Sequence, residues 1–237
     1  MKRRTRSLGV RHRGCRAVLA ALACLLLGPP SEARAAEPPP AQRGFQLAIR
    51  TGVALPFGNV SPTLPMSDAL SAQLPFLLDI GAKPFRYVFV GAYLGVAVGA
   101  AAGSIAESCS ALAVSCMGLG FRGGLQVQVH IRPDKRLNPW IGYGFGYEIG
   151  GSRGENETTT VKNNVRGFEI GHFLAGLDIR VDDYFAAGPF VDVALGKYDL
   201  AESLINAGGL VNTRGGQLEE KASHIWLILG ARAVLFP

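Results

Sequence analysis

Strict alternation of apolar residues with polar or small ones is the feature that most constrains this chain. In the stretch from 119 to 131, Leu, Phe, Gly, Leu, Val, Val and Ile occupy the odd positions, and Gly, Arg, Gly, Gln, Gln and His occupy the even ones. Successive side chains of a β-strand point to opposite faces, so an alternation with a period of two residues puts these apolar residues on one face of a strand. No face of a helix would collect them. The stretch therefore predicts a strand with one apolar face.

The same alternation occurs in eight segments of the chain. They lie at about 45–55, 74–83, 87–99, 119–131, 141–149, 168–181, 185–195 and 225–235. In the sixth segment Phe168 and Ile170 fall out of step with the apolar residues from Phe173 onward, which predicts a β-bulge near Gly171. The sequence thus predicts an all-β domain of eight strands.

The third segment also allows a different interpretation. Residues 87–106 carry no charge, and this segment is long enough to span a bilayer as a helix. Glycine recurs at every fourth residue, as in packed membrane helices, at Gly91, Gly95, Gly99 and Gly103. A spacing of four is also a multiple of two, so most of these glycines can equally line one face of a strand. Seven strands would leave open sheet edges, whereas an eighth can close the sheet, and this favours the strand.

The connections between the eight segments alternate in length. Short ones at 83–86, 133–138 and 181–184 alternate with long ones at 56–73, 100–118, 151–166 and 197–221. Tight turns at one end and long loops at the other are typical of transmembrane β-barrels. Aromatic residues near the predicted strand ends, among them Trp140 and Trp226, suggest interface belts.

The start of the chain predicts export. A basic head, the apolar run AVLAALACLLLG (17–28) and the small residues Ala33 and Ala35 have the order of a cleaved signal peptide over residues 1–35. Its removal takes away 8 of the 24 basic residues and 1 of the 18 acidic ones, leaving 16 and 17. The mature chain is then close to neutral, which argues against a nucleic-acid partner. A proline-rich arm at 36–43 would precede a barrel domain at 44–237.

In its layout, and in phrases such as WIGYGFGYEIG (140–150) and GPFVDVALG (188–196), the chain resembles the small outer-membrane β-barrels of Gram-negative bacteria, the OmpA-, OmpX- and OmpW-like group. The resemblance implies an eight-stranded antiparallel up-and-down transmembrane barrel with short periplasmic turns and long outer loops. It also implies contact with outer-membrane lipids and insertion by the barrel assembly machinery. A soluble lipocalin-like barrel is the alternative. The polar rows favour the membrane barrel, because their many glycines and alanines suit a narrow interior better than a solvated surface.

Parity directs eight charged side chains into the predicted interior, where eight strands leave room only for side chains. Isolated charges are costly there, so we expect them to pair with one another. This network would plug the barrel, with a gated or proton-conducting path as the alternative. Its members are Arg50, Asp79, Arg122, Glu148, Asp178, Arg180, Asp192 and Arg232.

Cys109 and Cys116 are the only cysteines outside the predicted signal peptide, and both lie in the second long loop. In an exported protein such a pair is expected to form a disulfide.

Two classes of function remain open. The first is a non-enzymatic barrel with a structural, binding or adhesion role through its outer loops, or one that passes small apolar compounds; its extracellular or small apolar ligand is unknown. The second is a lipid-modifying acyl hydrolase using His224 or His172, but Ser223 and His224 point to opposite faces and no acid has a recognisable spacing to either histidine. We therefore assign no catalytic residue, no metal ligand and no cofactor, and expect the protein not to be an enzyme.

Overall fold

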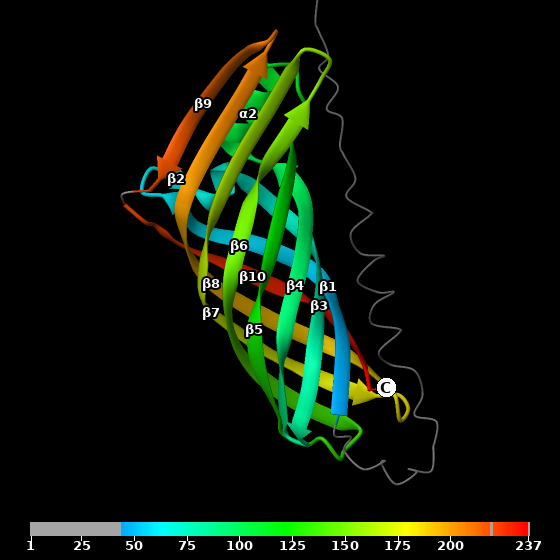
Figure 1. Ribbon diagram of the computed structural model, residues 1–237. Coiled ribbons are helices and arrows are strands. Elements are labelled where there is room, and N and C mark those ends of the chain that lie inside the picture. The colour runs from blue at the N-terminus through cyan, green and yellow to red at the C-terminus, as the bar shows by residue number, and fades with distance from the viewer. Residues whose placement is uncertain (1–43, 219, 237) are drawn as a thin grey trace, which may run out of the picture. The chain divides into compact units, whose positions relative to one another are not determined.

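The computed structural model describes residues 44–218 and 220–236. The predicted signal peptide (1–35) and the whole proline-rich arm (36–43) lie outside these residues. Eight long antiparallel strands form a closed ring (Figure 1). They are β1 (Gly44–Ser61), β3 (Leu70–Phe85), β4 (Val88–Ala101), β5 (Met117–His130), β6 (Leu137–Glu155), β7 (Thr159–Arg180), β8 (Phe185–Ala207) and β10 (Ser223–Leu235).

Each strand pairs with its neighbour in sequence, and β10 pairs with both β8 and β1, which closes the barrel. Closure leaves none of the eight barrel strands with an unpaired edge inside a bilayer. The predicted fold class, an eight-stranded antiparallel up-and-down barrel, is confirmed.

The third segment is strand β4, so the spanning-helix interpretation is wrong. Gly91, Gly95 and Gly99 lie within it, whereas Gly103 begins a helix, α2 (Gly103–Ala111). No helix in the described part of the chain is both long and apolar enough to span a membrane.

The predicted bulge is present: the β7–β8 register shifts between Glu169 and Gly171, and the β6–β7 register shifts opposite it, between Gly144 and Gly146. The extra residue moves Phe168 and Ile170 to the outer face together with Phe173, and their exposed fractions are 60%, 56% and 50%. Glu169 and His172, by contrast, are buried.

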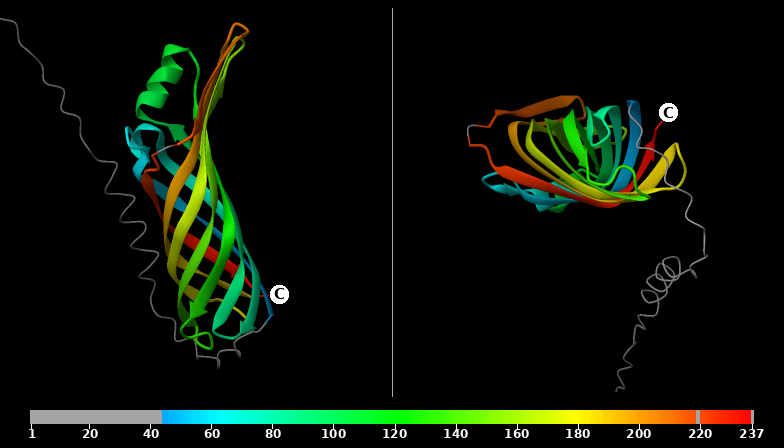
Figure 2. Two further views of the ribbon diagram at one scale, coloured as in Figure 1. Left: turned by 60° about the vertical axis from the view of Figure 1, so that its left-hand side comes forward. Right: turned by 90° about the horizontal axis from the view of Figure 1, so that it is seen from below.

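Two of the long connections are not loops, contrary to expectation. The β6–β7 and β8–β10 connections continue as paired strands well past the barrel; the second contains β9 (Leu210–Gln217), which runs along the outer part of β8 (Figure 2). Backbone pairing is satisfied there without apolar alternation, which is why the sequence pattern did not reveal these extensions.

The other two long connections are compact. The β1–β3 connection contains the short strand β2 (Leu64–Pro65) and the 3-10 turn η1 (Met66–Asp68). The β4–β5 connection contains α2, and a disulfide joins Cys109 to Cys116. Asn156 Nδ2 donates to Ala113 O at 3.2 Å, so this disulfide-closed segment is bonded to the β6–β7 hairpin.

Candidate functional site: a charged barrel interior below an apolar pocket

The two faces of the barrel wall differ in chemistry, as the alternation predicts. Large apolar side chains such as Leu94, Val96 and Phe121 are half exposed on the outer face. The inner face buries arginines, carboxylates, glutamines and three histidines. A surface of this kind is suited to lipid outside and to a self-paired interior.

The two tryptophans correct one expectation. Trp140 and Trp226 are only 1% and 2% exposed and lie inside the barrel rather than in an interface belt. Each is in register with the polar row of its strand, so strand parity decides the face and nearness to a strand end does not. Phe85, Tyr87 and Tyr184 are exposed near the short turns, as belt residues would be.

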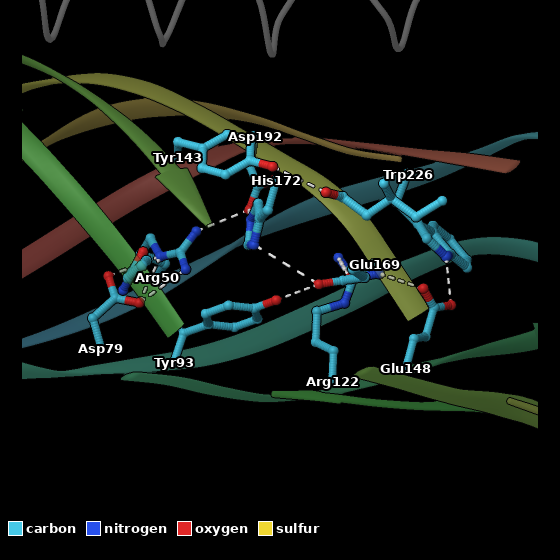
Figure 3. Close-up of polar contacts among 12 residues, drawn as sticks. Arg50, Asp79, Tyr93, Arg122, Tyr143, Glu148, Glu169, His172, Asp192 and Trp226 are labelled. Carbon is cyan, nitrogen blue, oxygen red and sulfur yellow. Dashed lines mark hydrogen bonds and ion pairs between the residues drawn. The ribbon is translucent and has the colours of Figure 1, made fainter. Parts of the chain in front are cut away.

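Arg50 lies near one end of the interior network, where it contacts two carboxylates (Figure 3). Its Nη2 lies 2.8 Å from Asp79 Oδ1 and its Nε 3.0 Å from Asp79 Oδ2, a two-point contact between β1 and β3. Its Nη1 lies 2.9 Å from Asp192 Oδ2 on β8. All three side chains are fully buried, and such charge-assisted, two-point contacts are the strong ones.

The network continues from Asp192 through two residues that parity reasoning did not select. His172 Nε2 lies 2.6 Å from Asp192 Oδ2, and His172 Nδ1 lies 3.8 Å from Glu169 Oε2. Glu169 in turn accepts a hydrogen bond from the Tyr93 hydroxyl and lies 3.2 Å from Arg122 Nη1. The bulge near Gly171 places Glu169 inside and was the sequence signal that could have pointed to it, whereas His172 has the parity of Asp178.

Glu148 ends the chain of contacts toward the outer side. Its Oε1 accepts hydrogen bonds from Tyr198 at 2.6 Å and from Trp226 Nε1 at 2.8 Å. Its Oε2 lies 3.3 Å from His224 Nε2 and 3.7 Å from Arg122 Nη2. Contacts therefore run without a break from Asp79 on β3 to His224 on β10.

A second group of polar residues fills the barrel near the short turns. Asp178 accepts a hydrogen bond from Trp140 Nε1 at 3.0 Å and lies 3.5 Å from Arg232 Nη1. Arg232 also donates to Gln128 Oε1 at 2.9 Å, and its guanidinium lies 4.2 Å from the centre of the Trp140 ring. Arg50 and Arg232 are directly opposite each other on β1 and β10, but each bonds its own carboxylates.

The structure therefore divides the eight predicted network residues. Arg50, Asp79, Asp192, Arg122 and Glu148 belong to one chain of contacts, and Asp178 and Arg232 to the other. Arg180 is half buried at the end of β7, where it donates to Pro133 O at 3.1 Å and lies over the Phe236 ring.

Interior glycines make room for the large polar side chains of the network. A Cβ atom at Gly196 would lie 2.6 Å from His224 Nε2, and one at Gly176 would lie 2.6 Å from Trp140 Cζ2. A Cβ at Gly146 would collide with the Tyr93 hydroxyl. The glycines on the inner face thus leave the space that the rings of Tyr93, Trp140 and His224 occupy.

The space left in the interior is small, and that at the outer end is large. An enclosed cavity of about 10 Å³ lies beside Arg122, Glu148 and Trp226, which is room for about one water molecule. Beyond Leu70, which contacts both spaces, a pocket of about 350 Å³ opens between the outer connections. We call it the outer pocket; its walls are mainly apolar, with contributions from Leu64, Ala69, Leu70, Ile105, Val165 and Ala201.

The residues considered for catalysis or metal binding are arranged differently from a hydrolase or metal site. His172 and His224 each lie against a carboxylate that the sequence spacing did not reveal, but both are buried in the network. Ser223 is exposed on the face opposite His224. Among residues 44–218 and 220–236, no group of three or more His, Cys, Asp or Glu side chains could hold a metal ion.

Comparison with known proteins yields similarity of fold only. No protein-family model matches the chain, and no curated protein matches it. Neisserial surface protein A is 11% identical, with a TM-score of 0.42, over 81% of this chain and 96% of its own. The outer membrane protein OprG of Pseudomonas aeruginosa is 11% identical, with a TM-score of 0.46, over 83% and 99%.

A major outer membrane protein of Thermus thermophilus is 13% identical, with a TM-score of 0.46, over 82% of this chain and 100% of its own. The closed eight-stranded barrel of this chain is established by its own strand pairing. What it does must be argued from its own interior and outer end, because likeness at these values does not extend to function.

Proposed function

We propose that this protein is an outer-membrane barrel that acts through its outer end, where the connections between strands bind a ligand, and that it is not an aqueous pore. The observation that carries the proposal is the contrast between the two spaces. The interior is bridged by contacts from Asp79 to His224, whereas the outer pocket above Leu70 is large and apolar. Binding at that end leaves the network intact, while passage along the barrel axis would have to break it.

The apolar outer face supports the location. Half-exposed aliphatic and aromatic side chains occur on all eight barrel strands, and a water-facing barrel would leave this large area unfavourably hydrated. Export by a cleaved signal peptide at residues 1–35 and insertion by the barrel assembly machinery are part of the proposal.

The proposal assigns the protein no enzyme activity. A general base must reach the proton that it removes, and His172 and His224 are buried among network partners rather than open to lipid. Lipid A from a deletion strain should therefore keep its acyl pattern, whereas an altered pattern restored by the wild-type gene would support the hydrolase.

Location is tested by fractionation and by gel mobility. The protein should be recovered with the outer membrane and should migrate differently before and after boiling in detergent, because a closed barrel resists detergent until it is heated. Recovery as a soluble periplasmic protein would overturn the proposal.

A further inference from the structure

The outer pocket is built from four separate segments of the chain. The β1–β3 connection supplies Leu64 and Ala69, α2 supplies Ile105, and the β6–β7 and β8–β9 extensions supply other lining residues, among them Val165 and Ala201. Figure 2 shows these segments at the same end of the barrel. A concave, mainly apolar space of a few hundred cubic ångströms with a few polar groups is the usual form of a small-molecule site.

Four of the polar side chains that line the pocket lie in one row across the strands. Strand register places Ser152 on β6 beside Asn163 on β7, Asn163 beside Ser203 on β8, and Ser203 beside Arg214 on β9. All four line the pocket, and Asn163 Nδ2 donates to Ser152 Oγ at 3.0 Å. A band of hydrogen-bonding groups therefore crosses the wall and ends at a cation.

Arg214 is the charged member of this row. Within residues 44–218 and 220–236 it has no hydrogen bond or ion pair, in contrast to the paired arginines of the barrel interior. Glu202 also borders the pocket. It is beside Asn164 and Gly215, one position along the strands from the row that contains Arg214, so the two charged residues are not in the same row. Arg214 is exposed, and the row of Ser152, Asn163, Ser203 and Arg214 carries one positive charge and no negative one.

Leu70 forms the floor of the pocket. Its side chain is 2% exposed and separates the outer pocket from the cavity beside Arg122 and Glu148. An apolar group resting on Leu70 would be shielded from the charged interior, while a negatively charged group in the pocket would find its counterion at Arg214.

We propose that the outer pocket binds a small amphiphilic anion, with an apolar body against Leu70, Ile105 and Val165 and a single carboxylate paired with Arg214. This inference rests on the proposed function and specifies the ligand class for the same outer end. A planar guanidinium matches a carboxylate in two-point geometry, and the hydroxyl and amide groups of Ser203 and Asn163 can bond its oxygens.

The probe is naphthylacetate, compared with the neutral naphthylethanol, which has the same apolar body. Heats of binding are measured with the protein in lipid nanodiscs, and protein-free nanodiscs are subtracted to remove partitioning into lipid. We expect saturable binding of naphthylacetate at one site and roughly tenfold weaker binding of naphthylethanol, from the loss of one charge-assisted bond.

Two variants with matched controls locate the site. Arg214→Gln should weaken naphthylacetate binding about tenfold and leave naphthylethanol unchanged. Arg166→Gln makes the same charge change at an exposed position outside the pocket and should have no effect. Ala201→Trp should fill the pocket and abolish binding of both probes, whereas Val211→Trp, at a position 62% exposed near the hairpin tip, should not.

Equal affinity for the two probes, no effect of Arg214→Gln, or unchanged binding to Ala201→Trp would each overturn the inference. The same preparations are checked for heat-dependent gel mobility. Absence of binding by a protein that passes this check contradicts the ligand class alone, whereas failure of the mobility and fractionation tests contradicts the proposed function itself.

Discussion

Arg50 Nη1 lies 2.9 Å from Asp192 Oδ2, and this contact joins two strands that are not neighbours in the sheet. Strand β10 lies between β1 and β8 and pairs with both, so the ion pair crosses the inner side of β10. Because Arg50 also holds Asp79 and Asp192 also holds His172, the pair connects β3, β1, β8 and β7 through the interior. Loss of the Arg50–Asp192 ion pair should therefore lower the stability of the whole barrel.

Asp192→Ala should lower the free energy of unfolding by about 3–5 kcal/mol, because it removes one of the two buried carboxylates that Arg50 contacts and leaves His172 without its nearest partner. The measurement is the denaturant midpoint of the barrel in detergent, followed by heat-dependent gel mobility. Asn212→Ser, at an exposed position in β9, is the control and should leave the midpoint unchanged. Equal midpoints for Asp192→Ala and wild type would mean that the network adds nothing to stability.

Gly196→Ala should destabilise the barrel by about 1–3 kcal/mol, because the new methyl group would lie 2.6 Å from a His224 ring that is already stacked on Tyr198. Gly150→Ala is the matched interior control, since its nearest neighbour would be Val165 at 3.6 Å, an ordinary contact. The two variants are compared by the same unfolding midpoint. A Gly196→Ala barrel as stable as the Gly150→Ala barrel would contradict the role given to the interior glycines.

The disulfide should shape the outer connection without holding the barrel together. Closing so short a segment contributes only about 2–3 kcal/mol in the chain-entropy model, and the segment lies outside the barrel strands, between β4 and β5. Cys109→Ser with Cys116→Ser should therefore make residues 103–116 more sensitive to protease while the barrel's unfolding midpoint stays the same. Two free thiols in the wild-type protein under non-reducing conditions would contradict the bridge.

The sequence was sufficient for the barrel itself because strand alternation has a period of exactly two residues. Eight alternating segments and the lengths of their connections indicated the strand count, the closure and the face of nearly every residue, including Arg50, Asp192 and His224. The β6–β7 and β8–β9 extensions were missed, since paired strands outside the barrel need no apolar face.

The partners within the interior could not be predicted from the sequence. Parity places Arg50 and Arg232 inside, but it does not say that Arg50 contacts Asp79 and Asp192 while Arg232 contacts Asp178. Those choices depend on strand tilt and stagger, which alternation does not encode. Glu169 was missed for a related reason, because a single bulge reverses parity over only a few residues.

The central claim is that side-chain contacts close the barrel interior and that the protein acts by binding a ligand at its outer end. Conductance of the purified wild-type protein in planar bilayers tests it most directly. We predict no large, steady aqueous current, because the chain of contacts from Asp79 to His224 fills the lumen and the enclosed cavity beside it is only about 10 Å³. A stable, porin-sized current from correctly inserted protein would contradict the account.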